Sequence, residues 1–135
     1  MTLRELRLSA MFQSNNDEED LGEFMPSLDD YINEGYDKLV EAYADKHLDP
    51  DEDEYNPLVN ERDEPELPSW CHRAIADYAT YMIYRNGNVT KQNRAMAYLQ
   101  LFNEMLMKVR EAGAKFRNGG NKVRLHGLYD RNNWD

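Results

Sequence analysis

Two apolar stripes separated by a tight turn constrain the fold of this chain more than any other feature. Apolar residues recur at steps of three and four from Cys71 to Met82 and again from Ala95 to Val109. This spacing places side chains on one face of an α-helix. The first stripe comprises Cys71, Ala74, Ile75, Tyr78, Ala79 and Met82, and the second comprises Ala95, Tyr98, Leu99, Phe102, Met105, Leu106 and Val109. Residues 67–109 are therefore predicted to form an antiparallel helical hairpin.

The residues between the stripes favour a short connection. Asn86, Gly87 and Asn88 suit a helix C-terminus, where a residue with positive φ is common, and the hydroxyl of Thr90 is predicted to cap the second helix. The only cysteine, Cys71, lies on the first stripe. One thiol cannot form an internal disulfide, and this position favours a buried packing role over a reactive one.

Two further helices are predicted before the hairpin. Thr2 and Glu5 match a capping box and predict a short helix over residues 3–11. A second helix is expected to begin at Pro26 and Ser27 and to end near Lys46. Its predicted buried face comprises Leu28, Ile32, Tyr36, Leu39, Val40 and Tyr43. Gly35 lies inside this pattern, which indicates close approach to a neighbouring helix. The chain is thus predicted to be all-α, a small helical bundle built on the hairpin.

The length of 135 residues favours one domain with one core. We expect a helical domain over residues 1–118, with an acidic insertion at 47–66 and an extended C-terminal tail at 119–135. The net charge of −10 argues against wrapping of nucleic acid by the whole surface. Charge is unevenly distributed, because residues 45–66 carry ten acids and two bases, whereas residues 108–131 carry seven bases and two acids.

The acidic insertion is predicted to be a long solvated loop. Asp49, Asp51 and Asp53 have the spacing of the first ligands of an EF-hand. However, Glu54 stands where the sharp turn needs glycine, and Asn60 stands where a bidentate glutamate is needed. This comparison disfavours a calcium site. The acidic residues that could face a channel or a neighbouring subunit are Asp49, Asp51, Glu52, Asp53 and Glu54.

The tail after the glycine pair Gly119-Gly120 alternates basic and apolar residues. Such alternation favours an extended segment that docks along another surface, and the other interpretation is a frayed terminus. The predicted docking residues are Lys122, Val123, Arg124, Leu125, His126, Leu128 and Tyr129.

The sequence offers no pattern that predicts enzyme chemistry, a metal site or a cofactor. His47, His72 and His126 stand in three different segments without ligand spacing, and Ser69 near His72 has no third group to orient a base. The N-terminal residues lack the uninterrupted apolar run of a secretion signal. No window approaches the roughly 20 apolar residues that span a bilayer. We therefore expect a soluble binding or structural protein.

The order of the segments resembles the head-to-tail connector, or adaptor, proteins of tailed bacteriophages. The segments that carry the resemblance, over about two thirds of the chain, are MTLRELR, LDDYINEGYDKLVEAYAD, LPSWCHRAIADYATYMIYRNGN and YLQLFNEMLMKV. They contain the motif residues Asn33, Glu34 and Tyr36; Leu67, Pro68, Ala74, Tyr78 and Ala79; and the pair Tyr98 and Phe102. The acidic insertion departs from the plainest members of this family.

The resemblance implies a virion protein that forms a ring, commonly of twelve copies, beneath the portal. Such an adaptor completes the head after DNA packaging and offers a docking surface to a tail or stopper protein, while DNA passes through the ring. The resemblance also implies that the tail reaches toward the portal. The alternative hypothesis is an acidic inhibitor that mimics DNA and occupies a nucleic-acid-binding host protein.

Deletion of residues 121–135 tests the predicted role of the tail. Helical content and melting temperature should stay nearly unchanged, because the predicted core lies upstream, whereas co-sedimentation with purified portal rings should be lost. Normal co-sedimentation of the truncated chain would identify the tail as a frayed end.

Overall fold

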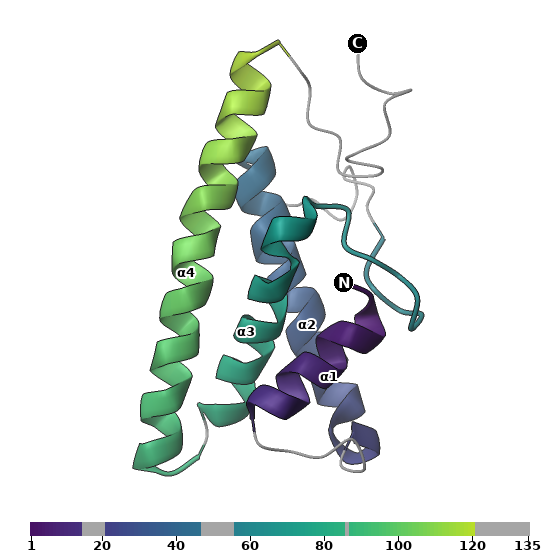
Figure 1. Cartoon of the computed structure of the whole chain (residues 1–135), viewed down its shortest axis with the longest axis vertical. Helices are drawn as coiled ribbons and strands as arrows, with labels where there is room; N and C mark the ends of the chain where they lie inside the picture. The colour runs from purple at the N-terminus through teal and green to yellow at the C-terminus, as the bar shows by residue number, and fades with distance from the viewer. Residues whose placement is uncertain (15–20, 47–55, 86, 121–135) are drawn as a thin grey trace.

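Four α-helices pack side by side in the part of the chain that the structure describes (Figure 1). This computed structural model describes residues 1–14, 21–46, 56–85 and 87–120, with the backbone alone for 21–25. The helices are α1 (Leu3–Gln13), α2 (Leu21–Ala44), α3 (His72–Tyr84) and α4 (Val89–Asn118), and a 3-10 turn, η2 (Ser69–Cys71), precedes α3. These ranges contain no β-strand. The prediction of an all-α bundle is confirmed.

The predicted hairpin is formed by α3 and α4, which pack antiparallel along each other. Every member of the α3 stripe is buried, including Cys71. The α4 stripe is narrower than predicted: Ala95, Phe102 and Val109 are buried, whereas Tyr98, Leu99, Met105 and Leu106 are half-buried. The buried residues recur every seventh position, because α4 rests on its neighbours along a narrow seam.

Helix α2 lies against both arms of the hairpin, and two glycines permit the contact. A Cβ on Gly35 would lie 3.1 Å from the Cβ of Tyr78 in α3. A Cβ on Gly113 would collide with the backbone carbonyl of Tyr43. The prediction of close helix approach at Gly35 is confirmed, and all six predicted core residues of α2 are buried.

The ends of two helices differ from the prediction. Helix α2 begins at Leu21, so Pro26 lies inside the helix instead of opening it. Proline lacks a backbone N–H, so one hydrogen bond of the helix, to the carbonyl four residues earlier, is missing at this position. At α4, Asn88 is the cap, since its side-chain oxygen accepts from Lys91 N at 3.0 Å. Thr90 therefore lies inside the helix and does not cap it.

The remaining helix boundaries follow the predicted signals closely. The capping box of α1 is formed, with Glu5 N donating to Thr2 Oγ1 at 3.2 Å and Thr2 N donating to Glu5 Oε1 at 3.0 Å. Helix α1 continues two residues past the predicted end, to Gln13. Helix α4 ends at Asn118, immediately before the glycine pair, as predicted.

Replacing Phe102 by Ala tests the core of the hairpin. Phe102 is 1% exposed and its ring centroid lies 4.9 Å from that of Tyr78. The substitution should lower the free energy of unfolding by about 3 to 5 kcal/mol, as for other buried aromatic residues. Leu99→Ala should cost clearly less, because Leu99 is half-buried. Equal losses in denaturant unfolding would contradict this packing.

Candidate functional site: two surfaces on opposite sides of the bundle

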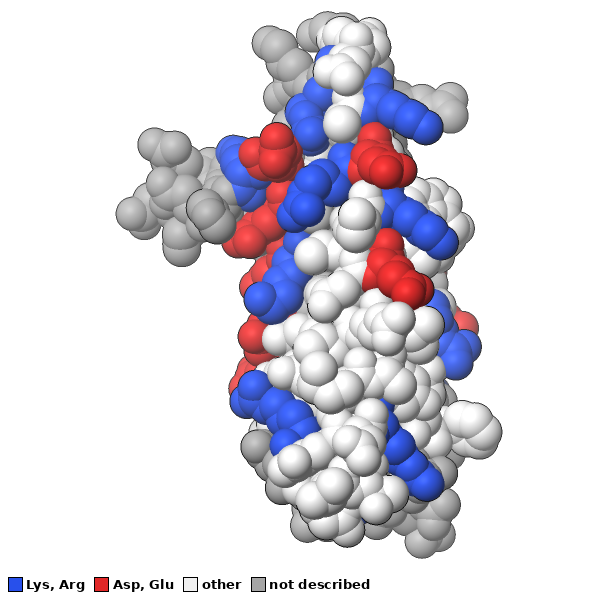
Figure 2. Space-filling model, turned by 90° about the vertical axis from the view of Figure 1, so that its left-hand side faces the viewer, with Lys and Arg blue, Asp and Glu red and all other residues white. Residues whose placement is uncertain are grey.

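Helix α4 presents a broad uncharged surface to solvent. Four large apolar residues on it are exposed: Val89 at 72%, Met96 at 59%, Leu101 at 49% and Met107 at 63%. Exposed Asn93, Ala97, Gln100 and Asn103 lie between them along the helix. We call these eight residues the α4 band. Figure 2 shows this side of the molecule with an uninterrupted uncharged area over its middle.

The band exists because α4 is much longer than its partner in the hairpin. It has 30 residues against 13 in α3, and its buried seam uses one residue in seven over most of its length. Single exposed apolar residues are ordinary on a protein surface, but several together mark an interaction site. Only Lys91, Arg94 and Glu104 are charged among residues 91–107. The band is therefore a candidate protein-binding surface.

Positive charge gathers near the C-terminal end of α4. Four of the ten residues from Lys108 to Arg117 are basic, and Glu111 is the only acid among them. Lys115 and Arg117 lie in the last turn, where cations are favoured by the helix dipole. The Arg117 guanidinium donates to the Tyr43 carbonyl, which ties this end of α4 to the end of α2. The band thus continues into a basic region.

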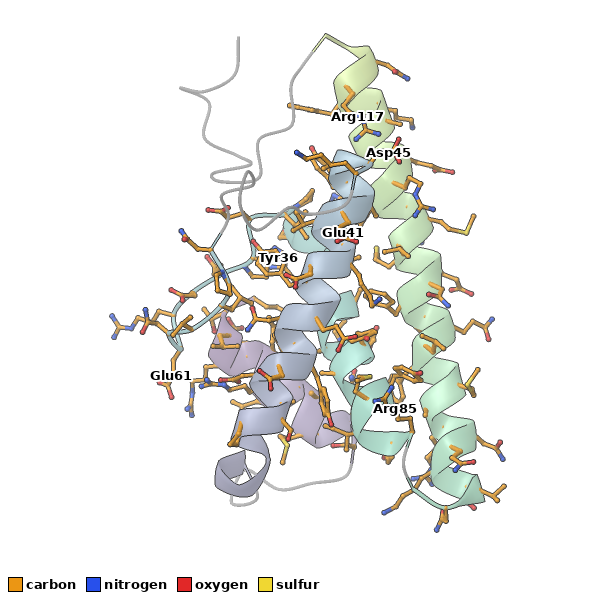
Figure 3. The ribbon with its side chains drawn as sticks, turned by 180° about the vertical axis from the view of Figure 1, so that it is seen from behind. Tyr36, Glu41, Asp45, Glu61, Arg85 and Arg117 are labelled. Carbon is orange, nitrogen blue, oxygen red and sulfur yellow. The ribbon has the colours of Figure 1, made fainter. Side chains whose placement is uncertain are left out.

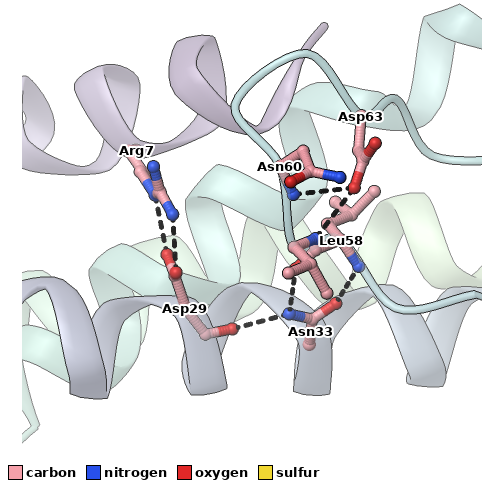
Figure 4. A network of polar contacts seen from close by, with 7 residues as sticks. Arg7, Asp29, Asn33, Leu58, Asn60 and Asp63 are labelled. Carbon is pink, nitrogen blue, oxygen red and sulfur yellow. Dashed lines mark hydrogen bonds and ion pairs between the residues drawn. The ribbon is translucent and has the colours of Figure 1, made fainter.

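A second surface is formed by residues 56–66, which we call the acidic strap. Its backbone is held by one side chain of α2, because Asn33 Oδ1 accepts from Leu58 N at 2.7 Å and Asn33 Nδ2 donates to Leu58 O at 3.0 Å (Figure 4). The Leu58 side chain is 3% exposed. An irregular segment with satisfied backbone groups and a buried anchor is fixed in place.

The strap also completes the start of α1. Leu3 N donates to Asp63 O at 2.8 Å, and Arg4 N donates to Glu61 O at 3.1 Å. These N–H groups belong to the first turn of α1 and have no partner within that helix. Within the strap, the Asp63 carboxylate accepts from Val59 N and Asn60 N at 3.0 and 2.8 Å, and these bonds lower the pKa of Asp63.

Two further contacts fix the α-helices beneath and beside the strap. Arg7 of α1 makes a two-pronged ion pair with Asp29 of α2, at 2.7 and 2.6 Å, and this pairing raises the pKa of the guanidinium (Figure 4). At the end of the strap, Glu66 N donates to the hydroxyl of Tyr36 at 2.8 Å. Burial raises the pKa of Tyr36, so this hydroxyl stays neutral.

Residues 56–66 form a loop without helix or strand, and most of them are exposed, but the contacts with α1 and α2 hold this loop in one place. Their outer side is acidic: Glu61 and Glu64 are exposed, Asp63 and Glu66 are half-buried, and Arg62 is the one basic residue. Val59 is 66% exposed. Figures 1 and 3 show the strap on the opposite side of the bundle from α4. Residues 49–54 were predicted to face a channel or a neighbouring subunit. They lie outside the described residues.

The other sequence-predicted candidates are placed as follows. The tail residues Lys122 to Tyr129 lie outside the described residues, as do His47 and His126. His72 is buried, with Nε2 2.8 Å from the Leu67 carbonyl oxygen, and burial lowers its pKa. In the parts of the chain with described side chains, no group of three or more His, Cys, Asp or Glu residues could hold a metal ion.

None of the described helices is long and apolar enough to cross a membrane.

Sequence analysis predicted the acidity of residues 56–66 as part of the insertion, but neither the contacts that hold the strap nor the α4 band. The sequence did contain a signal for the band, because α4 has apolar residues outside the stripe that was predicted to be buried. The strap had a weaker signal: Leu58 near its start and Leu67 just after its end flank a mostly polar stretch. The role of Asn33 depends on a contact 25 residues away in the sequence.

Comparison with known proteins yields no relative. The chain matches no protein-family model, no curated protein and no solved structure.

Replacing Asn33 tests whether the strap is held as described. Asn33→Ala removes both bonds to Leu58, whereas Asn33→Asp retains the acceptor and loses the donor. Amide hydrogen exchange at Leu58 should become at least about tenfold faster in the alanine variant, because a bond of about 1.4 kcal/mol is lost. The aspartate variant should keep more protection. Unchanged exchange at Leu58 in both variants would show that Asn33 does not hold the strap.

Proposed function

We propose that this chain is a virion structural protein, a ring-forming head-to-tail adaptor. In this role it binds beneath the portal, completes the head after DNA packaging, and offers a docking surface to a tail or stopper protein. In this role the protein binds and positions other virion proteins, and it needs neither a catalysed reaction nor a cofactor. DNA passes through the ring without specific binding. The order of segments that resembles phage adaptors supports this proposal.

The exposed α4 band is the observation that carries the proposal. An adaptor subunit must contact its neighbours as well as the proteins above and below it, so it needs apolar surface that its own fold leaves uncovered. Burying one Met or Leu side chain contributes about 1.5 to 3 kcal/mol. Met96, Leu101 and Met107 together can supply much of the adhesion of one subunit contact. Repetition around a ring multiplies this gain.

The rival function, an acidic DNA mimic, calls for different surfaces. A mimic presents negative charge to a basic enzyme, whereas the exposed face of α4 carries Glu104 as its only acid among residues 91–107 and is basic beyond them. Mass spectrometry of purified particles separates the two functions. We expect this chain among the virion proteins, in several copies per portal. Its absence from particles, with capture of a basic nucleic-acid-binding protein, would support the mimic.

Charges introduced into the band should prevent assembly. The double variant Met96→Glu, Met107→Glu should remain folded, since both side chains are exposed, and should lose self-association at high concentration in analytical ultracentrifugation. The cause is the desolvation of two carboxylates at an apolar contact. The matched control is Ser27→Glu, Ser69→Glu, which adds the same charge at exposed positions outside α4.

The control should associate like the unmodified chain. If the band variant associates normally, the band is not the subunit contact. If the unmodified chain stays monomeric at millimolar concentration and beside portal rings, the adaptor function itself is wrong.

A further inference from the structure

The two candidate surfaces carry opposite charge. Residues 89–118 of α4 contain six basic and two acidic residues, a sum of +4. The strap, residues 56–66, contains four acidic residues and one basic residue, a sum of −3. Each surface also has exposed apolar side chains: Val59 on the strap and Met96, Leu101 and Met107 on the band. The two surfaces are therefore complementary in charge and share an apolar component.

We propose that the acidic strap of one copy docks on the α4 band and basic end of the next copy. This inference rests on the proposed ring-forming function and names the two surfaces that meet. Because the strap and α4 lie on opposite sides of the bundle, one copy can use both surfaces at once (Figure 1). A contact between two different surfaces repeats from copy to copy, and it closes into a ring when the rotation allows.

The strap is suited to this contact because it is rigid before binding. Asn33, the start of α1 and the Tyr36 hydroxyl hold its backbone, so little conformational entropy is lost on docking. Val59 projects from it as an apolar anchor, 66% exposed. The methionines of the band are flexible and adapt to an inserted side chain. Glu61 and Glu64 on the strap would meet Lys108 and Arg110, which fixes the register.

Two other modes of contact fit the surfaces less well. A symmetric pairing of α4 with α4 would place a helix of +4 against another of +4, and like charges at an interface oppose binding. The groove between α2 and α4 has Tyr81, Leu99 and Leu106 in its lining. However, the groove is also lined by three basic residues, Lys38, Lys46 and Arg110, and two acidic ones, Glu41 and Asp45. This mixture of charges favours neither an acidic nor a basic partner.

Cysteine cross-linking distinguishes these modes. Two single variants, Val59→Cys and Met107→Cys, place thiols at exposed positions of the strap and the band. The native Cys71 is buried, and burial raises its pKa to about 12, so it should not react. Under mild oxidation at a concentration where the unmodified chain associates, the mixed variants should form disulfide dimers. Each variant alone should form few, and a chain that carries both substitutions should form a ladder of multimers.

Cross-linking of Met107→Cys alone as fast as the mixture would indicate α4-to-α4 contact and overturn the inference, while leaving the adaptor function in place. Self-association without any Val59–Met107 cross-link would overturn it as well. If the unmodified chain associates neither alone at millimolar concentration nor beside portal rings, the proposed function and this inference both fail.

Charge reversal provides a second test. Glu61→Lys and Lys108→Glu should each weaken self-association by at least about tenfold, and a mixture of the two variants should recover pairwise association. Asp30→Lys on α2 is the matched control, exposed and outside both surfaces, and should have little effect. If the mixture associates no better than either variant alone, Glu61 and Lys108 do not meet.

Discussion

The length of α4 is the constraint on which the arrangement of this protein depends. A helix of 30 residues cannot be covered by neighbours of 11, 24 and 13 residues that must also pack against one another. Helices α2 and α3 bury its seam, and α2 approaches it closely where Gly113 of α4 meets the backbone of Tyr43. The side of α4 away from the bundle then remains uncovered. Methionine, leucine and neutral amides on this side make it the candidate binding surface.

The strap follows from a second need, the satisfaction of backbone groups at the start of α1. Helix α1 opens with N–H groups that have no partner in the helix, and two of them donate to strap carbonyls. Asn33 in turn supplies a donor and an acceptor to Leu58. An irregular acidic segment thereby becomes part of the rigid body of the bundle. The same contacts that stabilise the fold also hold the exposed acidic residues of the strap in place.

The sequence predicted the parts of the fold that depend on local periodicity. The helical hairpin, the α2 core face, the capping box of Thr2 and Glu5, and the close approach at Gly35 are all confirmed, because each is encoded in neighbouring residues. The wrong predictions concern the starts of two helices, where more than one residue in the sequence could begin the helix. Asn88 displaced Thr90 as the cap of α4, and Pro26 proved compatible with the early part of a helix that begins at Leu21.

The candidate surfaces depend on contacts between distant residues, and the sequence alone could not place them. Composition showed that residues 45–66 are acidic, but not that Asn33 fixes residues 56–66 against α2. The apolar residues of α4 could be read from the sequence, yet which of them are covered depends on the lengths and directions of the other helices. The predicted acidic loop residues 49–54 and the tail residues 122–129 stay predictions.

The most direct measurement of the central claim is a methyl NMR titration of the protein labelled at its methionine methyl groups. Met96 and Met107 lie on the band, whereas Met11 and Met82 are buried in the core at 1% and 5% exposure. As concentration rises into the range of assembly, the signals of Met96 and Met107 should shift and broaden while those of Met11 and Met82 stay in place. Oligomer formation with unchanged Met96 and Met107 signals would contradict the claim that the outer face of α4 is the surface through which this protein assembles.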